Sequence, residues 1–179
     1  MKVKLLILIG VFMTVLNVNF LEAQSNTACS LCNENVLKNQ KFYEDEHVSI
    51  LYDYKPIIRG HCLVIPKRHV EHLQDLTDQE MLAAHKAIGE LFKASQKTYE
   101  ATSYLILQKN GRAAGQSVPH VHFHFFPRKE GDYSDIGVLA RFYLSSFKGP
   151  ISQDQIDTER NLIAQEIYGA NSVEFQEAQ

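Results

Sequence analysis

The chain has 179 residues, which suits one domain with short extensions and leaves little room for two independent catalytic domains. Hydrophobic residues make up 45% of the chain and charged residues 22%, so a packed core is expected, and three cysteines are too few for a disulfide framework. The formal net charge of −3 argues against a protein that binds nucleic acid through a broad basic surface.

The N-terminus has the pattern of a secretory signal peptide over residues 1–23. Lys2 and Lys4 precede an apolar run over residues 5–16, which is shorter than the roughly 20 apolar residues of a membrane-spanning helix. An uncleaved membrane anchor is the alternative, whereas lipid attachment at Cys29 fits poorly because Asn26 stands where such a site has Leu. We therefore predict an exported protein, periplasmic or secreted, with a membrane-anchored form as the rival.

The first part of the remaining chain predicts two strands. Residues 42–51 mix aromatic and β-branched residues with charge, as in a half-buried strand, and the charged run 44–46 within them indicates a solvated turn. The apolar run HCLVIP, residues 61–66, is the second strand, and residues 53–60 form the turn between them.

Helical periodicity marks two further segments. The motif Thr77-x-x-Glu80 is a capping box, and apolar residues then recur at helical spacing, which predicts a long helix over residues 78–99. Residues 156–167 form a second amphipathic pattern, introduced by Ser152.

Between these helices, residues 104–108 and 118–126 predict two strands joined by the loop NGRAAGQ, with Pro127 ending the second strand. The strands follow one another around one long helix instead of alternating with several helices. The pattern therefore favours an α+β fold with an antiparallel sheet over a parallel α/β fold.

Three histidines alternate with apolar residues in the sequence HVHFHFF, residues 120–126. In a strand, His120, His122 and His124 would share one face, with apolar side chains on the other. His120 and His124 would then lie about 13 Å apart, too far to bind one zinc ion together. An unprotonated imidazole can instead attack phosphorus, and His122, which has a histidine on either side, is best placed to do so.

The loop before these histidines adds features of an anion site. Gly111 and Gly115 allow backbone N–H groups to approach a phosphate, although each glycine alone is typical of a hairpin turn. Ser117 offers a hydroxyl that can contact a phosphate oxygen or a leaving group.

At this point the chain resembles the histidine triad (HIT) family, whose hallmark is three histidines alternating with apolar residues. The resemblance covers about residues 29–128 and also includes YEDEHV at 43–48, DYKP at 53–56, GHCLVIPKRH at 60–69 and AGQSVPH at 114–120. It implies a single histidine triad domain over residues 24–179, with a core at 29–128 and a C-terminal extension with a helix at 129–179. It further implies a five-stranded antiparallel sheet with a long helix and a C-terminal helix, in a homodimer whose sheets join at their edges.

The same resemblance assigns roles to individual residues. His122 matches the nucleophile that forms a covalent nucleotidyl-histidine, supported by His124 and His61, and Ser117 matches the residue beside the leaving group. Asp53 matches the acid that binds the ribose hydroxyls. The nucleotide-binding set is Asp53, Asn110, Gly115, Gln116 and Ser117. Lys109 departs from the family, which often has an amide side chain there, and a lysine would hold a phosphate as a point charge instead.

Cys29-x-x-Cys32 has the spacing of two ligands to one tetrahedral metal ion. Resemblance to a zinc-binding subset of the family adds His69 and His120 as the other two ligands, which predicts a structural Zn²⁺. In an exported protein the two thiols could instead pair as a disulfide, or remain free. Cys62, within an apolar run, is expected in the core.

The predicted function is a nucleotide hydrolase that cleaves at the α-phosphate of dinucleoside polyphosphates or nucleoside phosphoramidates. The alternatives are a nucleotide-binding or interaction protein of low turnover, and a nucleotidyltransferase. In the nucleotidyltransferases that share this motif, the position that corresponds to His124 is Gln, so the histidine here favours hydrolysis. Residues 131–179 are where we expect substrate specificity to reside.

Overall fold

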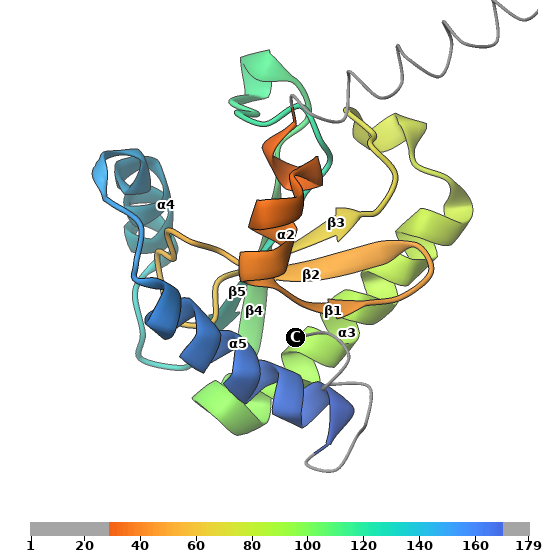
Figure 1. Cartoon of the computed structure of the whole chain (residues 1–179). Helices are drawn as coiled ribbons and strands as arrows, with labels where there is room; N and C mark the ends of the chain where they lie inside the picture. The colour runs from red at the N-terminus through yellow and green to blue at the C-terminus, as the bar shows by residue number, and fades with distance from the viewer. Residues whose placement is uncertain (1–28, 170–179) are drawn as a thin grey trace, which may run out of the picture.

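The structure, a computed structural model, describes residues 29–169, so the predicted signal peptide at 1–23 lies outside the described residues. Five strands form one antiparallel sheet in the order β1-β2-β3-β5-β4 (Figure 1). The strands are β1 (Lys41–Glu44), β2 (Val48–Tyr52), β3 (Cys62–Pro66), β4 (Ser103–Gln108) and β5 (Phe123–Arg128). The predicted α+β fold with a five-stranded antiparallel sheet is confirmed.

The single strand predicted over residues 42–51 is two strands, β1 and β2, which pair as a hairpin. The charged run between them is the turn, where Asp45 Oδ1 accepts hydrogen bonds from the backbone N–H groups of His47 and Val48 at 2.7 and 2.8 Å. An Asp side chain that bonds to the backbone two residues on stabilises such a turn. This turn breaks the strand that alternation alone predicts.

Both predicted helices are present. Helix α3 (Asp78–Tyr99) begins with the capping box of Thr77 and Glu80, and helix α5 (Gln153–Tyr168) begins at the cap Ser152. Two further helices, α2 (Glu34–Gln40) and α4 (Asp135–Leu144), were not predicted, and each is capped by a side chain, Asn33 and Ser134 respectively. Short 3-10 turns complete the described residues: η1 (Ser30–Cys32), η2 (Leu73–Asp75), η3 (Arg112–Ala114) and η4 (Ser145–Phe147).

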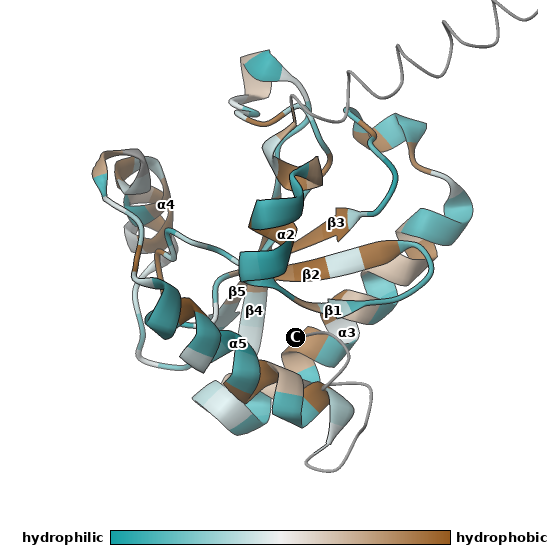
Figure 2. Cartoon of the chain, viewed as in Figure 1, coloured by the Kyte–Doolittle hydropathy of each residue, from teal (hydrophilic) through white to brown (hydrophobic). Residues whose placement is uncertain are grey.

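The two faces of the sheet pack against different partners. Helices α3 and α5 cover one face, where the main core includes Ile50, Val64 and Phe125. On the other face Leu51, Leu63 and Ile65 pack with Cys29 and Leu31 of the N-terminal segment. Strands β2 and β3 are accordingly apolar along most of their length (Figure 2). The predicted core position of Cys62 is confirmed, since its side chain is buried on the α3 side.

Strand β5 begins later and ends later than predicted. It covers Phe123–Arg128, so His120 and His122 precede the strand, and Pro127 lies inside it opposite Tyr104. Pairing of β5 with β3 ends at Phe125, so the missing N–H of Pro127 costs no hydrogen bond to β3. The prediction of three histidines on one continuous strand is therefore wrong. No helix within residues 29–169 is long and apolar enough to cross a membrane.

Candidate functional site

A cavity of about 730 Å³ opens on the sheet face opposite α3. It is lined by residues from five parts of the chain: the N-terminal segment with α2, the stretch from the end of β2 into β3, the glycine loop after β4, the residues around the start of β5, and the end of α4. The lining includes the predicted site residues Asp53, His61, Gly115, Ser117, His122 and His124, together with Lys109, Phe142 and Tyr143. The structure thus brings together in one cavity most of the residues that the sequence predicted.

The tautomer of His122 is set by a backbone carbonyl. His122 Nδ1 lies 2.7 Å from the carbonyl oxygen of His120, and since a carbonyl only accepts, Nδ1 carries the proton and Nε2 is left free. Burial lowers the pKa of His122, against smaller raising effects from that hydrogen bond and from Asp53. At neutral pH the ring is therefore neutral, with an unprotonated Nε2.

His61, His124 and Asp53 form a second hydrogen-bonded group beside His122. His61 Nε2 lies 3.0 Å from His124 Nδ1 and 3.4 Å from Asp53 Oδ2. A proton on His61 Nε2 serves both acceptors, which leaves the proton of a neutral His124 on its Nε2. Burial lowers the pKa of both histidines, that of His61 to about 3, so both rings are neutral.

Burial has the opposite effect on Asp53, whose pKa it raises to about 6, while the backbone N–H of Lys55 donates to Oδ1 at 2.7 Å and partly offsets this. Asp53 is therefore largely a carboxylate at neutral pH, available to accept hydrogen bonds. One ligand atom from each of Asp53, His61 and His124 lies within 4.8 Å of the others, a spacing that a cation could also use.

The glycine loop is held in place by Gln116. Its Oε1 accepts from the backbone N–H of Gly111 at 2.6 Å, and its Nε2 donates to the carbonyls of Glu71 and Val118, each at 3.0 Å. A third carbonyl, that of His120, lies 3.3 Å from the same nitrogen. Gln116 is thus a positioning residue behind the cavity, where the sequence predicted nucleotide contact.

Asn110, also predicted to contact the nucleotide, is turned toward η2. Its Oδ1 accepts from the backbone N–H of Leu73 at 2.8 Å, and its Nδ2 donates to Gln74 Oε1 at 3.0 Å. Asn110 does not line the cavity. Gly115, with a φ of 81°, and Ser117 do line it.

The lining residues that the sequence did not predict come mainly from the end of α4 and from the N-terminal segment with α2, which contributes Ser30, Leu31, Val36 and Gln40. Phe142, Tyr143 and Ser145 line the cavity at the end of α4, and the rings of Phe142 and Tyr143 lie close to Lys109. The available signal for α4 was the cap at Ser134, whose side chain accepts from the backbone N–H of Gly137. The residues at the end of α4 lie in the C-terminal region where the sequence analysis expected specificity.

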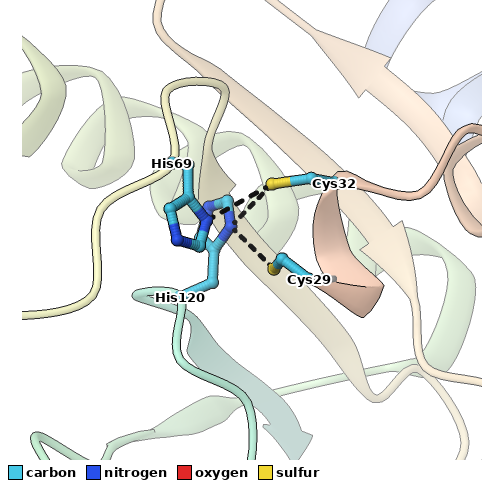
Figure 3. A group of neighbouring side chains, drawn as sticks. All are labelled: Cys29, Cys32, His69 and His120. Carbon is cyan, nitrogen blue, oxygen red and sulfur yellow. Dashed lines mark hydrogen bonds between the residues drawn. The ribbon is translucent and has the colours of Figure 1, made fainter. Parts of the chain in front are cut away.

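The two cysteines meet His69 and His120 at a second site (Figure 3). Three segments contribute: the N-terminal segment, the loop after β3 and the segment that leads into β5. Cys29 Sγ lies 3.5 Å from His120 Nδ1, and Cys32 Sγ lies 3.4 Å from His120 Nδ1 and 3.5 Å from His69 Nδ1. A tetrahedral zinc ion with ordinary Zn–S and Zn–N bonds separates such atoms by about 3.5 Å.

The surroundings of this cluster also fit a metal ion. His120 Nε2 donates to the carbonyl oxygen of Pro66 at 2.9 Å, which leaves Nδ1 unprotonated and directed at the thiols. Both cysteines are free in the structure. Burial, with Cys29 close by, raises the pKa of Cys32 to about 12, so an ion must displace protons from the thiols when it binds.

Comparison with known proteins agrees with the arrangement of the histidines described above. The sequence model of the HIT domain matches residues 34–131. The chain belongs to the HIT family. Among its relatives is the adenosine 5'-monophosphoramidase of Saccharomyces cerevisiae, 30% identical over 144 residues that cover 71% of this chain and 87% of that one.

Two further HIT proteins are relevant, one to the cavity and one to the cluster of cysteines and histidines. The asymmetrical bis(5'-nucleosyl)-tetraphosphatase of Schizosaccharomyces pombe is 38% identical over 97 residues, 54% of this chain, which span 53% of that protein. A crystal structure of a Zn-bound histidine triad family protein from Mycobacterium smegmatis aligns with a TM-score of 0.54 and 29% identity, covering 70% of this chain and 84% of that one.

Proposed function

We propose that this HIT protein is a nucleotide hydrolase that cleaves at the α-phosphate of a nucleotide conjugate through a covalent nucleotidyl-His122. The observation that carries the proposal is the hydrogen bond from His122 Nδ1 to the carbonyl of His120, which leaves Nε2 as a free nucleophile in a cavity.

The reaction has two steps. In the first, His122 Nε2 forms a bond to the α-phosphorus, the bond to the leaving group breaks, and the leaving group takes a proton from water while Ser117 donates a hydrogen bond to it. In the second, water attacks the phosphorus, the P–N bond breaks, the nucleotide departs, and the proton of the attacking water goes to solvent. His122 returns to its starting state.

The neighbours of His122 support both steps. The proton on His124 Nε2, set by the hydrogen bond between His61 and His124, is available to a phosphate oxygen whose charge grows in the transition state. Asp53 lines the cavity and is largely a carboxylate at neutral pH, which supports a role as the acceptor of hydrogen bonds from the ribose hydroxyls. Each group thus binds a part that every nucleotide conjugate carries.

The substrate classes are dinucleoside polyphosphates and nucleoside phosphoramidates, the two classes named for the yeast relatives. A binding protein of low turnover and a nucleotidyltransferase remain the alternative functions. Turnover separates the first, and transfer of the nucleotide to an acceptor other than water separates the second.

We propose further that Cys29, Cys32, His69 and His120 hold one structural Zn²⁺. Four protein ligands complete a tetrahedron, so the ion supplies a cross-link between three segments and no open position for water. Because His120 also presents the carbonyl that orients His122, this cross-link lies next to the reacting residue.

Two proposals concern the whole protein. Strand β4 is an edge of the sheet and carries an exposed Tyr104, so we propose that two copies pair through this edge as a homodimer. The pattern of residues 1–23 supports export, and N-terminal sequencing of protein from its native host tests it.

The proposed activity is tested with the variant His122→Ala. We expect loss of hydrolysis by more than about 1000-fold with nucleotide affinity changed by less than about threefold, since the variant removes the nucleophile and leaves Asp53 in place. A loss of activity below tenfold would remove His122 from the nucleophile's role. Absence of turnover by the unaltered protein with both substrate classes would favour the binding function.

A further inference from the structure

Lys109 places an unpaired positive charge in the cavity. It directly follows β4, and its Nζ lies 4.4 Å from the ring centroid of Phe142 and 5.3 Å from that of Tyr143. Within residues 29–169 no carboxylate forms an ion pair with it. The faces of aromatic rings attract an ammonium group without neutralising it. An anionic ligand is therefore the partner that this position lacks.

The neighbours of Lys109 locate its ammonium group within the cavity. A side-chain carbon at Gly115 would lie 3.6 Å from Lys109 Nζ, so the lysine lies against the loop that also carries Ser117. Besides burial, Lys109 lowers the pKa of His122 and of His124, whereas the ionisable groups that act on the pKa of Asp53 are His122 and Lys55. Asp53 and Lys109 thus both lie near His122, and neither acts measurably on the other.

We propose that Lys109, held by Phe142 and Tyr143, forms a subsite for an anionic leaving group, so that this enzyme prefers nucleotides linked to further phosphates over phosphoramidates of simple amines. The inference rests on the proposed function and on the ribose being bound at Asp53. A nucleotide oriented this way extends its leaving group past His122 toward Ser117 and Lys109.

The preference follows from charge. A phosphate beyond the α-phosphate pairs with the Lys109 ammonium in a partly dry site, where such a charge-assisted contact is strong. A departing amine offers no negative charge, leaves the lysine unpaired and, once protonated, is repelled by it. The rings of Phe142 and Tyr143 already hold the Lys109 ammonium group in the cavity, so less side-chain freedom is lost when the phosphate binds.

The test compares two substrates that share adenosine 5'-monophosphate as the transferred group, diadenosine tetraphosphate and adenosine 5'-phosphoramidate. In Lys109→Met we expect kcat/KM for the tetraphosphate to fall about 10- to 100-fold and that for the phosphoramidate to change less than about threefold. Lys109→Arg should retain most of the preference. Lys86→Met, which removes an exposed lysine of α3 beyond the opposite sheet face, is the control for net charge and should change neither value.

Equal losses with both substrates would mean that Lys109 holds the α-phosphate and would overturn the leaving-group subsite, as would no loss with either. Binding separates this inference from the hydrolase proposal. We expect Lys109→Met to weaken ATP at least tenfold more than it weakens AMP, whether or not the protein turns over. Equal affinity changes for ATP and AMP would refute the subsite, while failure of the unaltered protein to hydrolyse either substrate would refute only the hydrolase proposal.

Discussion

Removing one zinc ligand by Cys32→Ser should destabilise the fold and leave the chemical step largely intact. The proposed ion joins the N-terminal segment, the loop after β3 and the segment before β5, so its loss frees three parts of the chain. Free zinc at about 1000 times its dissociation constant contributes about 4 kcal/mol to the free energy of unfolding.

Packing adds to this figure. Cys29 and Leu31 are buried against Leu51, Leu63 and Ile65, and a freed N-terminal segment exposes part of that surface. Partial exposure of one leucine costs about 1 to 2 kcal/mol, so we expect a total loss of about 5 to 6 kcal/mol. For a domain of this size, at about 3 °C per kcal/mol, that lowers Tm by about 15 to 18 °C.

The assay is thermal unfolding with and without a chelator, together with zinc analysis and a free-thiol count. The unaltered protein should contain one zinc per chain, and the chelator should lower its Tm while leaving that of Cys32→Ser unchanged. At a temperature well below Tm, kcat of the variant should fall less than about tenfold, because Gln116 also holds the carbonyl of His120. Absence of both zinc and titratable Cys29 and Cys32 thiols would refute the zinc site and establish the disulfide.

Two further predictions use the geometry near the cavity. Gly60→Ala should lower the free energy of unfolding, measured by denaturant titration, by at least about 3 kcal/mol. A side-chain carbon at this position would lie 2.5 Å from Tyr99 Cε2, and the backbone φ of 82° disfavours any residue but glycine. A loss below about 1 kcal/mol would contradict this reasoning. Affinity for AMP should weaken about tenfold from pH 7 to pH 5, because Asp53, with a pKa raised to about 6, becomes protonated as pH falls and no longer accepts hydrogen bonds from the ribose as a carboxylate. The variant Asp53→Asn should bind AMP weakly and without this pH dependence. The same pH dependence in that variant would assign the titration to another group.

Local signals in the sequence were enough for the two long helices. The side chains of Thr77 and Glu80 bond reciprocally at the start of α3, and Ser152 caps α5 in the same way, so each boundary is encoded within four residues. The charged run 44–46 correctly indicated the turn held by Asp45, but the single strand predicted over residues 42–51 was wrong, because apolar alternation alone does not show that this turn separates two strands.

The site was predictable where a motif is contiguous and unpredictable where the fold decides. His122 and His124 lie two residues apart, so the sequence could place them in one site. His120 faces the cysteines instead of the cavity, and this depends on its long-range hydrogen bond to the carbonyl of Pro66. The side chain of Asn110 points toward η2, and that of Gln116 bonds to the backbone of the glycine loop. Both orientations depend on tertiary hydrogen bonds, which the spacing of residues in the sequence does not predict. The aromatic residues around Lys109 lie more than 30 positions further along the chain, on a helix whose apolar face is half exposed.

The central claim is a covalent bond between His122 and a nucleotide. Intact-mass analysis of the unaltered protein, quenched in acid-free denaturant within the first turnovers of a nucleotide conjugate, measures it most directly. We predict an added nucleotidyl mass that maps to the peptide containing His122, decays with the rate of hydrolysis and is absent from His122→Ala. Turnover at full rate with no added mass at any time, or an adduct that persists in His122→Ala, would contradict the account.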